Sequence, residues 1–225
     1  MKNAIVLGMF LLAGGVLSWA YGKTSAGIPP PANLVPNGDL ERGKEVPLGW
    51  EEPDDLTTFW ERRPEGGHCF RFDTDVYMHE VKARRAQMKL PRDQRPPAKP
   101  KTPTSGPRYN TAAGVSGVWL YSDYLEVEPG ATYRLRVEVM SRGPEVKIFV
   151  KGYALRHGER RVVWRTYKTY KQPDGRWRMV ERTFTIPRRA GSPVRWIRLQ
   201  PYAFWPPGEV FFDNFGVVKV TGAEN

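Results

Sequence analysis

The sequence predicts an all-β domain built as an antiparallel β-sandwich. Turn-forming residues are abundant, because 22 glycines and 21 prolines stand among the 225 residues. The second half of the chain is a series of short segments in which apolar and polar residues alternate, which is the pattern of half-buried strands. Outside the first 22 residues, no long stretch has the apolar spacing of a helix. Many short strands joined by turns favour two packed sheets.

The expected strands follow one another with turn signals between them. In residues 132–140, Tyr133, Leu135, Val137 and Val139 alternate with charged residues, so one face of this strand is apolar. Proline and glycine punctuate the series at 129–130, 173–175 and 206–208. The eight or nine strands expected lie near 50–60, 68–76, 117–127, 132–140, 145–155, 160–170, 176–186, 194–204 and 209–220.

Aromatic residues on these strands supply most of the expected core. We assign Trp50 to the sandwich edge and Trp177, Phe184, Trp196, Phe211 and Phe212 to the core. The only cysteine, Cys69, cannot form an intramolecular disulfide and is expected to be a small buried residue of the 68–72 strand.

The first 22 residues are typical of a signal peptide. Lys2 is followed by an apolar run over 5–17 and by the small residues of Ala20-Tyr21-Gly22. Export to the periplasm, the cell surface or the medium follows, and the alternative is a membrane anchor formed by an uncleaved N-terminal helix. The remaining divisions expected are a Pro-rich linker at 23–32, the sandwich at 33–221 and a tail at 222–225.

One segment makes the protein cationic. Residues 82–108, called the basic segment, contain nine lysines and arginines, one aspartate and six prolines, and so carry eight of the eleven net positive charges. With so few large apolar residues, we expect a flexible, disordered insertion in the sandwich, apart from a helical turn that fits around 78–90. It is either a solvated insertion without a partner or a polyanion contact formed by Arg84, Arg85, Lys89, Arg92, Arg95, Lys99 and Lys101.

Four motifs carry a resemblance to a known family. They are Asn33–Glu41 with Pro47–Trp50, the strand-turn-strand of 125–139, the Trp-led strand of 175–187 and the closing strand of 210–220. In this order they resemble galactose-binding-like jelly rolls, and most closely the CenC-type carbohydrate-binding modules attached to xylanases and cellulases. The resemblance covers residues 33–220 apart from the basic segment, and it implies a jelly-roll fold whose first and last strands lie close together.

The same resemblance implies a structural calcium ion between those strands. Its ligands would be the side chains of Glu41 and Asp213 and the carbonyl of Asp39. Carboxylates and carbonyls are the ligands that Ca²⁺ prefers. The alternative is that Glu41 pairs with one of the many arginines. The three histidines are scattered without zinc-ligand spacing.

The resemblance also implies sugar binding on a sheet face or at the loop end. Trp and Tyr rings suit this role because the axial C–H face of a pyranose is apolar. Our best platform is Trp164 and Tyr170 with Lys168 between them on one face of their strand, and further candidates are Tyr121, Tyr153, Tyr202 and Trp205. The alternative for each aromatic is a place in the sandwich core.

No catalytic motif emerges from the sequence. The strand motifs of alginate-type polysaccharide lyases, a Gly-x-Ser-x-Gly elbow and a P-loop are all missing. We therefore expect an exported, non-catalytic protein that binds polysaccharide, with acidic chains favoured by the basic segment, and no specific nucleic-acid partner. The alternatives are a structural envelope or surface sandwich without a sugar site and a polyanion-binding protein acting through the basic segment.

Overall fold

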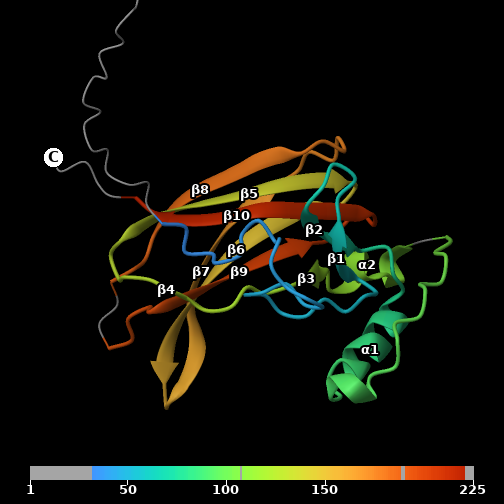
Figure 1. Cartoon of the computed structure of the whole chain (residues 1–225), viewed down its shortest axis with the longest axis horizontal. Coiled ribbons are helices and arrows are strands. Elements are labelled where there is room, and N and C mark those ends of the chain that lie inside the picture. The colour runs from blue at the N-terminus through green and yellow to red at the C-terminus, as the bar shows by residue number, and fades with distance from the viewer. Residues whose placement is uncertain (1–31, 107, 189–190, 221–225) are drawn as a thin grey trace, which may run out of the picture. The chain divides into compact units, whose positions relative to one another are not determined.

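Two antiparallel sheets lie face to face in the computed structural model, which describes residues 32–106, 108–188 and 191–220 (Figure 1). Sheet one has the strand order β1 (Thr58–Arg62), β2 (His68–Asp73), β10 (Glu209–Lys219), β5 (Thr132–Arg142) and β8 (Arg178–Thr185). Sheet two has the order β3 (Val118–Trp119), β9 (Trp196–Ala203), β6 (Val146–Arg156) and β7 (Glu159–Tyr170), with β4 (Leu125–Glu126) also paired to β9. The antiparallel jelly-roll sandwich expected from the sequence is confirmed. The leader, the linker up to residue 31 and the segment 221–225 lie outside the described residues.

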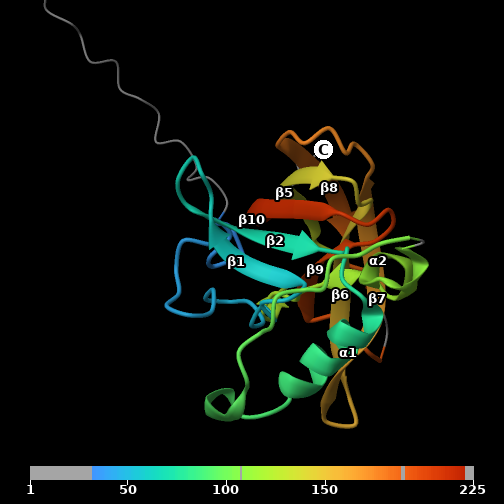
Figure 2. The same cartoon turned by 90° about the vertical axis from the view of Figure 1, so that its right-hand side faces the viewer.

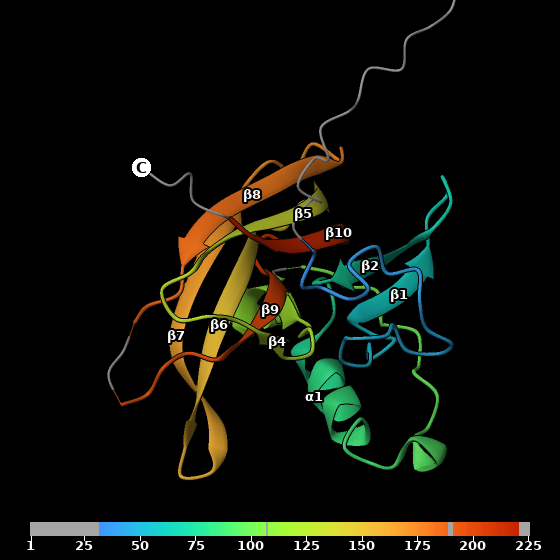
Figure 3. The same ribbon diagram turned by 60° about the vertical axis from the view of Figure 1, so that its left-hand side comes forward.

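The alternating pattern of each long strand decides which side faces the other sheet. On β5, the buried residues are Tyr133, Leu135, Val137 and Val139, as the sequence predicted. On β6, Val146, Ile148 and Val150 are buried while their neighbours are partly exposed. Figures 2 and 3 show the two sheets from other directions, with the tip of the β6–β7 hairpin extending past the other strands.

An aromatic cluster fills the space between the sheets. Trp50 lies with its ring centroid 4.5 Å from that of Phe215 and 5.1 Å from that of Phe70, and Phe72 lies 4.9 Å from Phe212. These side chains are buried, and so is Cys69, as expected. Burial of this much apolar surface stabilises the sandwich without any disulfide.

Three aromatic residues assigned to the core lie elsewhere. Trp177, Trp196 and Phe211 are only partly buried, whereas Phe184 and Phe212 belong to the core. The reason is the period of a strand. Phe211 and Phe212 are neighbours on β10, so only one of them can face the other sheet.

The opening motif lies against the last strand, as the resemblance implied. The Leu34 amide donates to the Val217 carbonyl at 2.8 Å, and the Phe215 amide donates to the Gly38 carbonyl at 2.7 Å. Glycine is required at position 38, because a Cβ there would lie 1.9 Å from the Phe215 oxygen. Residues 33–41 form turns rather than the entry strand expected, and the opposing part of β10 is irregular between Asp213 and Gly216.

The basic segment has defined structure, unlike the disordered insertion expected. Its residues 82–87 form the second part of helix α1 (Met78–Gln87), where the helical turn was expected. The segment then continues through the 3₁₀ turn η1 (Arg92–Gln94). It returns to the sandwich through η2 (Arg108–Asn110) and α2 (Ala112–Val115). No helix among the described residues is long and apolar enough to cross a membrane.

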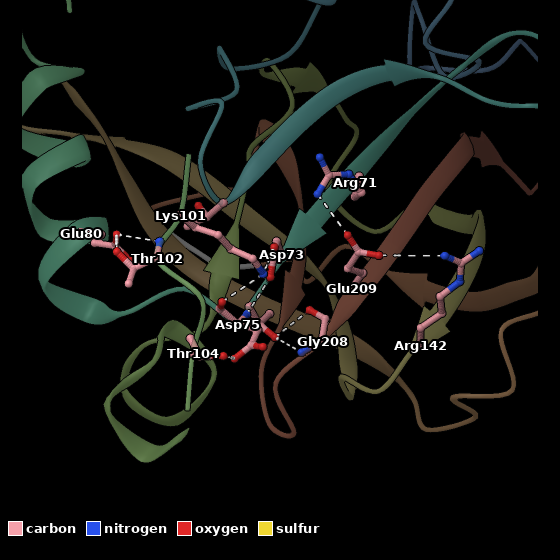
Figure 4. Close-up of polar contacts among 12 residues, drawn as sticks. Arg71, Asp73, Asp75, Glu80, Lys101, Thr102, Thr104, Arg142, Gly208 and Glu209 are labelled. Atoms are coloured by element: carbon pink, nitrogen blue, oxygen red, sulfur yellow. Dashed lines mark hydrogen bonds and ion pairs between the residues drawn. The ribbon is translucent and has the colours of Figure 1, made fainter. Parts of the chain in front are cut away.

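Acidic side chains of β2, of the residues just after it and of helix α1 hold the basic segment in place (Figure 4). Lys101 Nζ donates to Asp73 Oδ2 at 2.5 Å, and the Thr102 amide and hydroxyl donate to Glu80 Oε1 at 3.0 and 2.7 Å. The Thr104 hydroxyl donates to Asp75 at 2.8 Å. These contacts replace the apolar burial that the segment lacks, and composition alone does not reveal them.

Candidate functional site

The outer face of sheet two, which looks away from sheet one, gathers aromatic side chains from β3, β6, β7 and β9 and from the segment between β3 and β4. We call it the aromatic face, and its aromatic members are Trp119, Tyr121, Tyr124, Phe149, Tyr153, Tyr167, Trp196 and Tyr202. Partly exposed rings dominate it, and Tyr153 alone is fully buried among these eight.

Strand register brings these rings into one layer. Phe149 is paired with Tyr167 on one side and with Gln200 on the other, so the three side chains point the same way. The Phe149 ring lies 5.3 Å from the Tyr167 ring and 5.9 Å from the Tyr202 ring. Tyr202 is seated by close packing, because a Cβ at Gly117 would lie 2.5 Å from its ring.

Cations lie over several of these rings. The Arg160 guanidinium lies 4.5 Å from the Tyr124 ring and 4.7 Å from the Trp196 ring. Lys147 Nζ lies 5.5 Å from the ring of Tyr167. These distances are those of cation–π contacts, in which the ring holds the cation without removing its charge.

Arg198 is fixed at the centre of the face. Its guanidinium lies 4.6 Å from the Tyr121 ring, its Nε donates to the Ser122 carbonyl at 2.6 Å, and its Nη2 donates to Glu51 at 2.8 Å. Ser122 is itself tied to β9, since the Leu199 amide donates to its hydroxyl at 2.9 Å. Arg198 therefore has a set orientation before any ligand arrives.

Burial and charge shift the titration of the central groups. Burial raises the pKa of Tyr153 to about 12 and raises the pKa of Tyr121, so both phenols stay protonated at neutral pH. Burial also lowers the pKa of Lys151, and nearby Arg165 and Arg198 lower it further. Lys151 Nζ donates to the Tyr121 hydroxyl at 2.5 Å. The face thus offers protonated phenols and fixed cations as hydrogen-bond donors.

The residues predicted as a sugar platform divide between the two sides of sheet two. Tyr121, Tyr153 and Tyr202 lie on the aromatic face. Trp164, Lys168 and Tyr170 share one side of β7, as predicted, but it is the inner side, because their partners on β6 are Gly152, Ile148 and Val146. Trp164 packs against the core and Tyr170 is buried, while Lys168 is exposed at the sheet edge.

Trp205 belongs to a different place in the fold. It lies just after β9, and its ring stacks on that of Tyr109 with 4.9 Å between centroids and 2° between planes. It is 38% exposed.

Sequence reasoning missed Tyr124, Phe149, Tyr167 and Arg198 as members of the face. A signal for Phe149 was present, because Lys147, Phe149, Lys151 and Tyr153 alternate with the apolar residues of β6. The strand was predicted, yet no weight was given to its second face. Tyr124 and Arg198 meet only through tertiary contacts between residues far apart in the chain.

The two carboxylates that the resemblance assigns to calcium each have another partner. Arg63 Nη1 donates to Asp213 Oδ2 at 2.5 Å, and the His68 amide donates to Glu41 Oε1 at 2.6 Å. Burial raises the pKa of Asp213, and the Arg63 guanidinium opposes that rise. Asp39 is exposed, and within the described residues no group of three acidic, His or Cys side chains could hold a metal ion. As placed, these side chains do not fit a shared ion, and the calcium site stays a prediction of the resemblance.

Most cations of the basic segment are bound to the sandwich. Arg84 is buried and donates to the Asp54 carbonyl at 2.6 Å, and Arg85 lies 4.4 Å from the Trp119 ring. Arg92 and Arg95 both pair with Glu52, and Lys101 pairs with Asp73. Of the seven polyanion candidates, Lys89 and Lys99 alone have no side-chain hydrogen bond, ion pair or ring contact to another described residue.

Comparisons with known proteins find carbohydrate-binding modules among the similar solved structures. The sequence matches no protein-family model, and no curated protein matches it. Among solved structures, the "Family 16 Carbohydrate Binding Module-2" is similar with a TM-score of 0.44 and 15% identity, over 83% of this chain and 99% of that one. The CBM22-1 xylan-binding domain of Paenibacillus barcinonensis Xyn10C gives a TM-score of 0.46 and 11% identity, over 86% and 98%.

A longer protein is also similar. The enzymatically active domain of tailspike protein 4 from bacteriophage CBA120 gives a TM-score of 0.49 and 9% identity. The match covers 84% of this chain and 21% of the tailspike chain, so this protein spans about a fifth of that length. The fold assignment rests on the strand pairing of the chain itself, and the CenC-type grouping stays a prediction.

Proposed function

We propose that the protein is a non-catalytic carbohydrate-binding domain whose ligand lies on the aromatic face. The observation that carries the proposal is a layer of partly exposed rings with cations fixed among them. Rings of this kind stack on the apolar C–H faces of sugars, and the cations and phenols between them donate hydrogen bonds to the polar rim.

The charge of the face favours acidic chains. Lys147, Lys151, Arg160, Arg165 and Arg198 all lie on it, and the carboxylate of Glu51 is bound to Arg198. A sugar chain that carries carboxylate or sulfate groups would gain charge-assisted hydrogen bonds there. We therefore place the preference for acidic polysaccharide on the aromatic face rather than on the basic segment, whose cations are largely paired.

The titration of the face argues against a lyase reaction on it. A lyase of this architecture uses a tyrosine or histidine as the base. Burial raises the pKa of both Tyr121 and Tyr153, which disfavours the phenolate that would act as a base. Binding without chemistry is the simpler role for this arrangement, and export through the leader would bring the domain to extracellular polysaccharides.

A glycan array tests the proposal. The purified protein is applied in low and high salt to neutral, uronic and sulfated polysaccharides. Binding that survives high salt is expected, because stacking is not screened by ions. If no glycan on the array is bound, the proposal is wrong and a structural role for the sandwich is favoured.

A matched pair of variants locates the binding. Arg198→Gln removes the charge at the centre of the aromatic face, and it should weaken binding to every glycan that the wild type retains. Arg134→Gln removes an arginine from sheet one, outside the aromatic face, and should leave binding unchanged. If both variants lose glycan binding equally, the ligand lies elsewhere or is attracted only by the net charge of the protein.

A further inference from the structure

A cavity of about 670 Å³ lies on the outer face of sheet one, on the opposite side of the sandwich from the aromatic face. The β1–β2 turn and the loop that leads into β8 form two of its walls, through residues 63–65 and 175–177. Its size is that of pockets that hold small organic ligands. The charged residues of its lining are Arg62, Arg63, Arg71, Arg142, Arg176, Glu61, Glu65 and Glu209.

A second cavity of about 470 Å³ shares two of these residues. Arg71 and Glu209 line both cavities, so the two adjoin on one sheet face. The far wall of the second cavity is the basic segment, through residues 98–101. Figure 4 shows Glu209 between Arg71 and Arg142, with Lys101 bound to Asp73 on the side of the basic segment.

The arginines of the first cavity fall into two groups. Arg71 is held in place, because its Nε donates to Glu61 at 2.9 Å and its Nη1 donates to Glu209 at 3.2 Å. Arg142 is 4.0 Å from Glu209 and half exposed. Arg62 and Arg176 have no side-chain hydrogen bond or ion pair to another described residue. Fixed donors and uncommitted cations therefore line the same space.

Aromatic rings support these cations. The Arg63 guanidinium lies 4.4 Å from the Trp177 ring, and that of Arg142 lies 5.2 Å from the Phe211 ring. Met140 and Cys69 add apolar surface to the lining. The thiol is not a reactive group, because burial raises the pKa of Cys69 to about 12. The cavity is therefore lined by both apolar side chains and cationic guanidinium groups.

The glutamates narrow the class of ligand. Glu61 and Glu209 each bind Arg71 and still present further carboxylate lone pairs, which require donors on a ligand. A DNA backbone offers those positions only acceptors and negative charge, and an RNA backbone adds one hydroxyl per nucleotide. A sugar acid supplies hydroxyl donors for the glutamates and carboxylates for the arginines, whose planar guanidinium matches a carboxylate.

We propose that the two cavities form one elongated site for an acidic oligosaccharide, a short chain of uronic acid sugars, separate from the aromatic face. In this site Arg142 and Arg62 meet carboxylates, and Lys99 of the basic segment extends the cationic row. The proposal rests on the proposed function in taking carbohydrate as the class of ligand. It gives the basic segment a defined task, because docking through Lys101 builds a wall of the site.

Calorimetric titration of the full protein with trigalacturonic acid tests the site, with neutral galactotriose as the comparison sugar. Arg142→Gln should weaken the affinity for the acidic trimer about tenfold, the usual effect of losing one charge-assisted contact. Arg62→Gln should act in the same direction. Arg134→Gln is the matched control, because Arg134 lies on the same face of β5 outside both cavities. Its affinity for the trimer should equal that of the wild type.

Several results would overturn the proposal. Equal losses in the Arg134 and Arg142 variants would reduce the effect to general charge screening. An unchanged Arg142 variant, or a loss of affinity for the acidic trimer that is greater on Tyr167→Ala than on Arg142→Gln, would place the ligand elsewhere. If the peptide triglutamate binds as tightly as trigalacturonic acid, the ligand of the cavities is an acidic peptide rather than a sugar.

The two proposals fail in different ways. If galactotriose or another neutral glycan binds while trigalacturonic acid does not, the second site is wrong and the proposed function stands. If the acidic trimer binds and depends on Arg142 while the Arg198 variant keeps all glycan binding, the second site stands and the aromatic face loses its role.

Discussion

The two outer faces of the sandwich use the same residue types in different ways. On the aromatic face, cations such as Arg160 and Lys147 lie on rings, and Arg198 lies on a ring and is also bound to the carboxylate of Glu51. On sheet one, Arg71 and Arg63 are held by the acids Glu61 and Asp213. The first face is a layer of partly exposed rings, whereas the second contains a cavity of about 670 Å³.

The difference shows what decides the role of an arginine. Stacked on a ring, it keeps a full charge and exposed donors for a ligand. On sheet one, Arg71 is bound by two carboxylates and becomes part of the framework, which leaves recognition to neighbours such as Arg142. Composition and net charge do not reveal this distinction, because the arginines of both faces count equally toward the net charge of +11.

The largest expected effect comes from the layer that the two faces share. Phe212 is fully buried between the sheets, and Phe212→Ala should lower the free energy of unfolding by about 3–5 kcal/mol. Phe211 is its neighbour on β10 and faces outward, so Phe211→Ala should cost about 1 kcal/mol or less. Denaturant unfolding measures both. Similar losses would contradict the assignment of the two residues to opposite sides of sheet one.

The second effect separates the inner and outer sides of β7. Trp164 packs against the core with its ring 6.0 Å from that of Phe184. Trp164→Ala should therefore lower the free energy of unfolding by about 2 kcal/mol, less than for a fully buried ring. The folded fraction should keep the glycan affinity of the wild type in titrations below the unfolding transition. A stable variant with lost binding would return Trp164 to the sugar platform that the sequence suggested.

A smaller effect is expected on the outer side of the same strand. Tyr167 is 46% exposed, so Tyr167→Ala should leave the unfolding midpoint unchanged. It should weaken glycan binding by about 1 kcal/mol through the loss of one stacking ring. Tyr109→Ala is the control, because that ring is 70% exposed and stacks on Trp205 rather than on the aromatic face. An affinity loss confined to the Tyr109 variant would move the site to the Trp205 loop.

The smallest effect concerns the edge of sheet one, at Glu41. The hydrogen bond from the His68 backbone amide, with further contacts to the His68 ring, lowers the pKa of Glu41. A carboxyl whose pKa is lowered on folding stabilises the protein above its ordinary pKa, and this contribution is lost as the pH falls through the lowered value. The melting temperatures of wild type and Glu41→Gln should therefore differ at neutral pH and converge in acid. A constant difference would mean that the charge of Glu41 is not responsible.

The same melting experiment includes the test for calcium. If Glu41 and Asp213 share an ion, calcium raises the melting temperature of the wild type at neutral pH, because binding to the folded state stabilises it. Chelator then reverses the effect, and Glu41→Gln abolishes it. An unchanged melting temperature in calcium and in chelator removes the calcium assignment.

Much of the fold followed from local patterns. The alternation in 132–140 predicted both β5 and its buried side, and the 68–72 pattern predicted β2 with Cys69 buried. The opening motif contains Gly38, and the structure shows why glycine stands there, because a Cβ would meet the Phe215 carbonyl. Assignments failed where one strand presents aromatics on both sides, as at Phe211 and Phe212, because period-two spacing does not say which side is inside.

Sequence alone determined the sandwich class, the succession of most strands along the chain and the segment that carries most of the net charge. Each of these depends on residues close together in the chain. Only the tertiary structure decided what those charges do. Asp73 and Lys101, or Glu51 and Arg198, become partners when distant segments meet, at 2.5 and 2.8 Å. Whether an arginine supports the fold or contacts a ligand depends on these long-range contacts. The local spacing of residues in the sequence does not predict them.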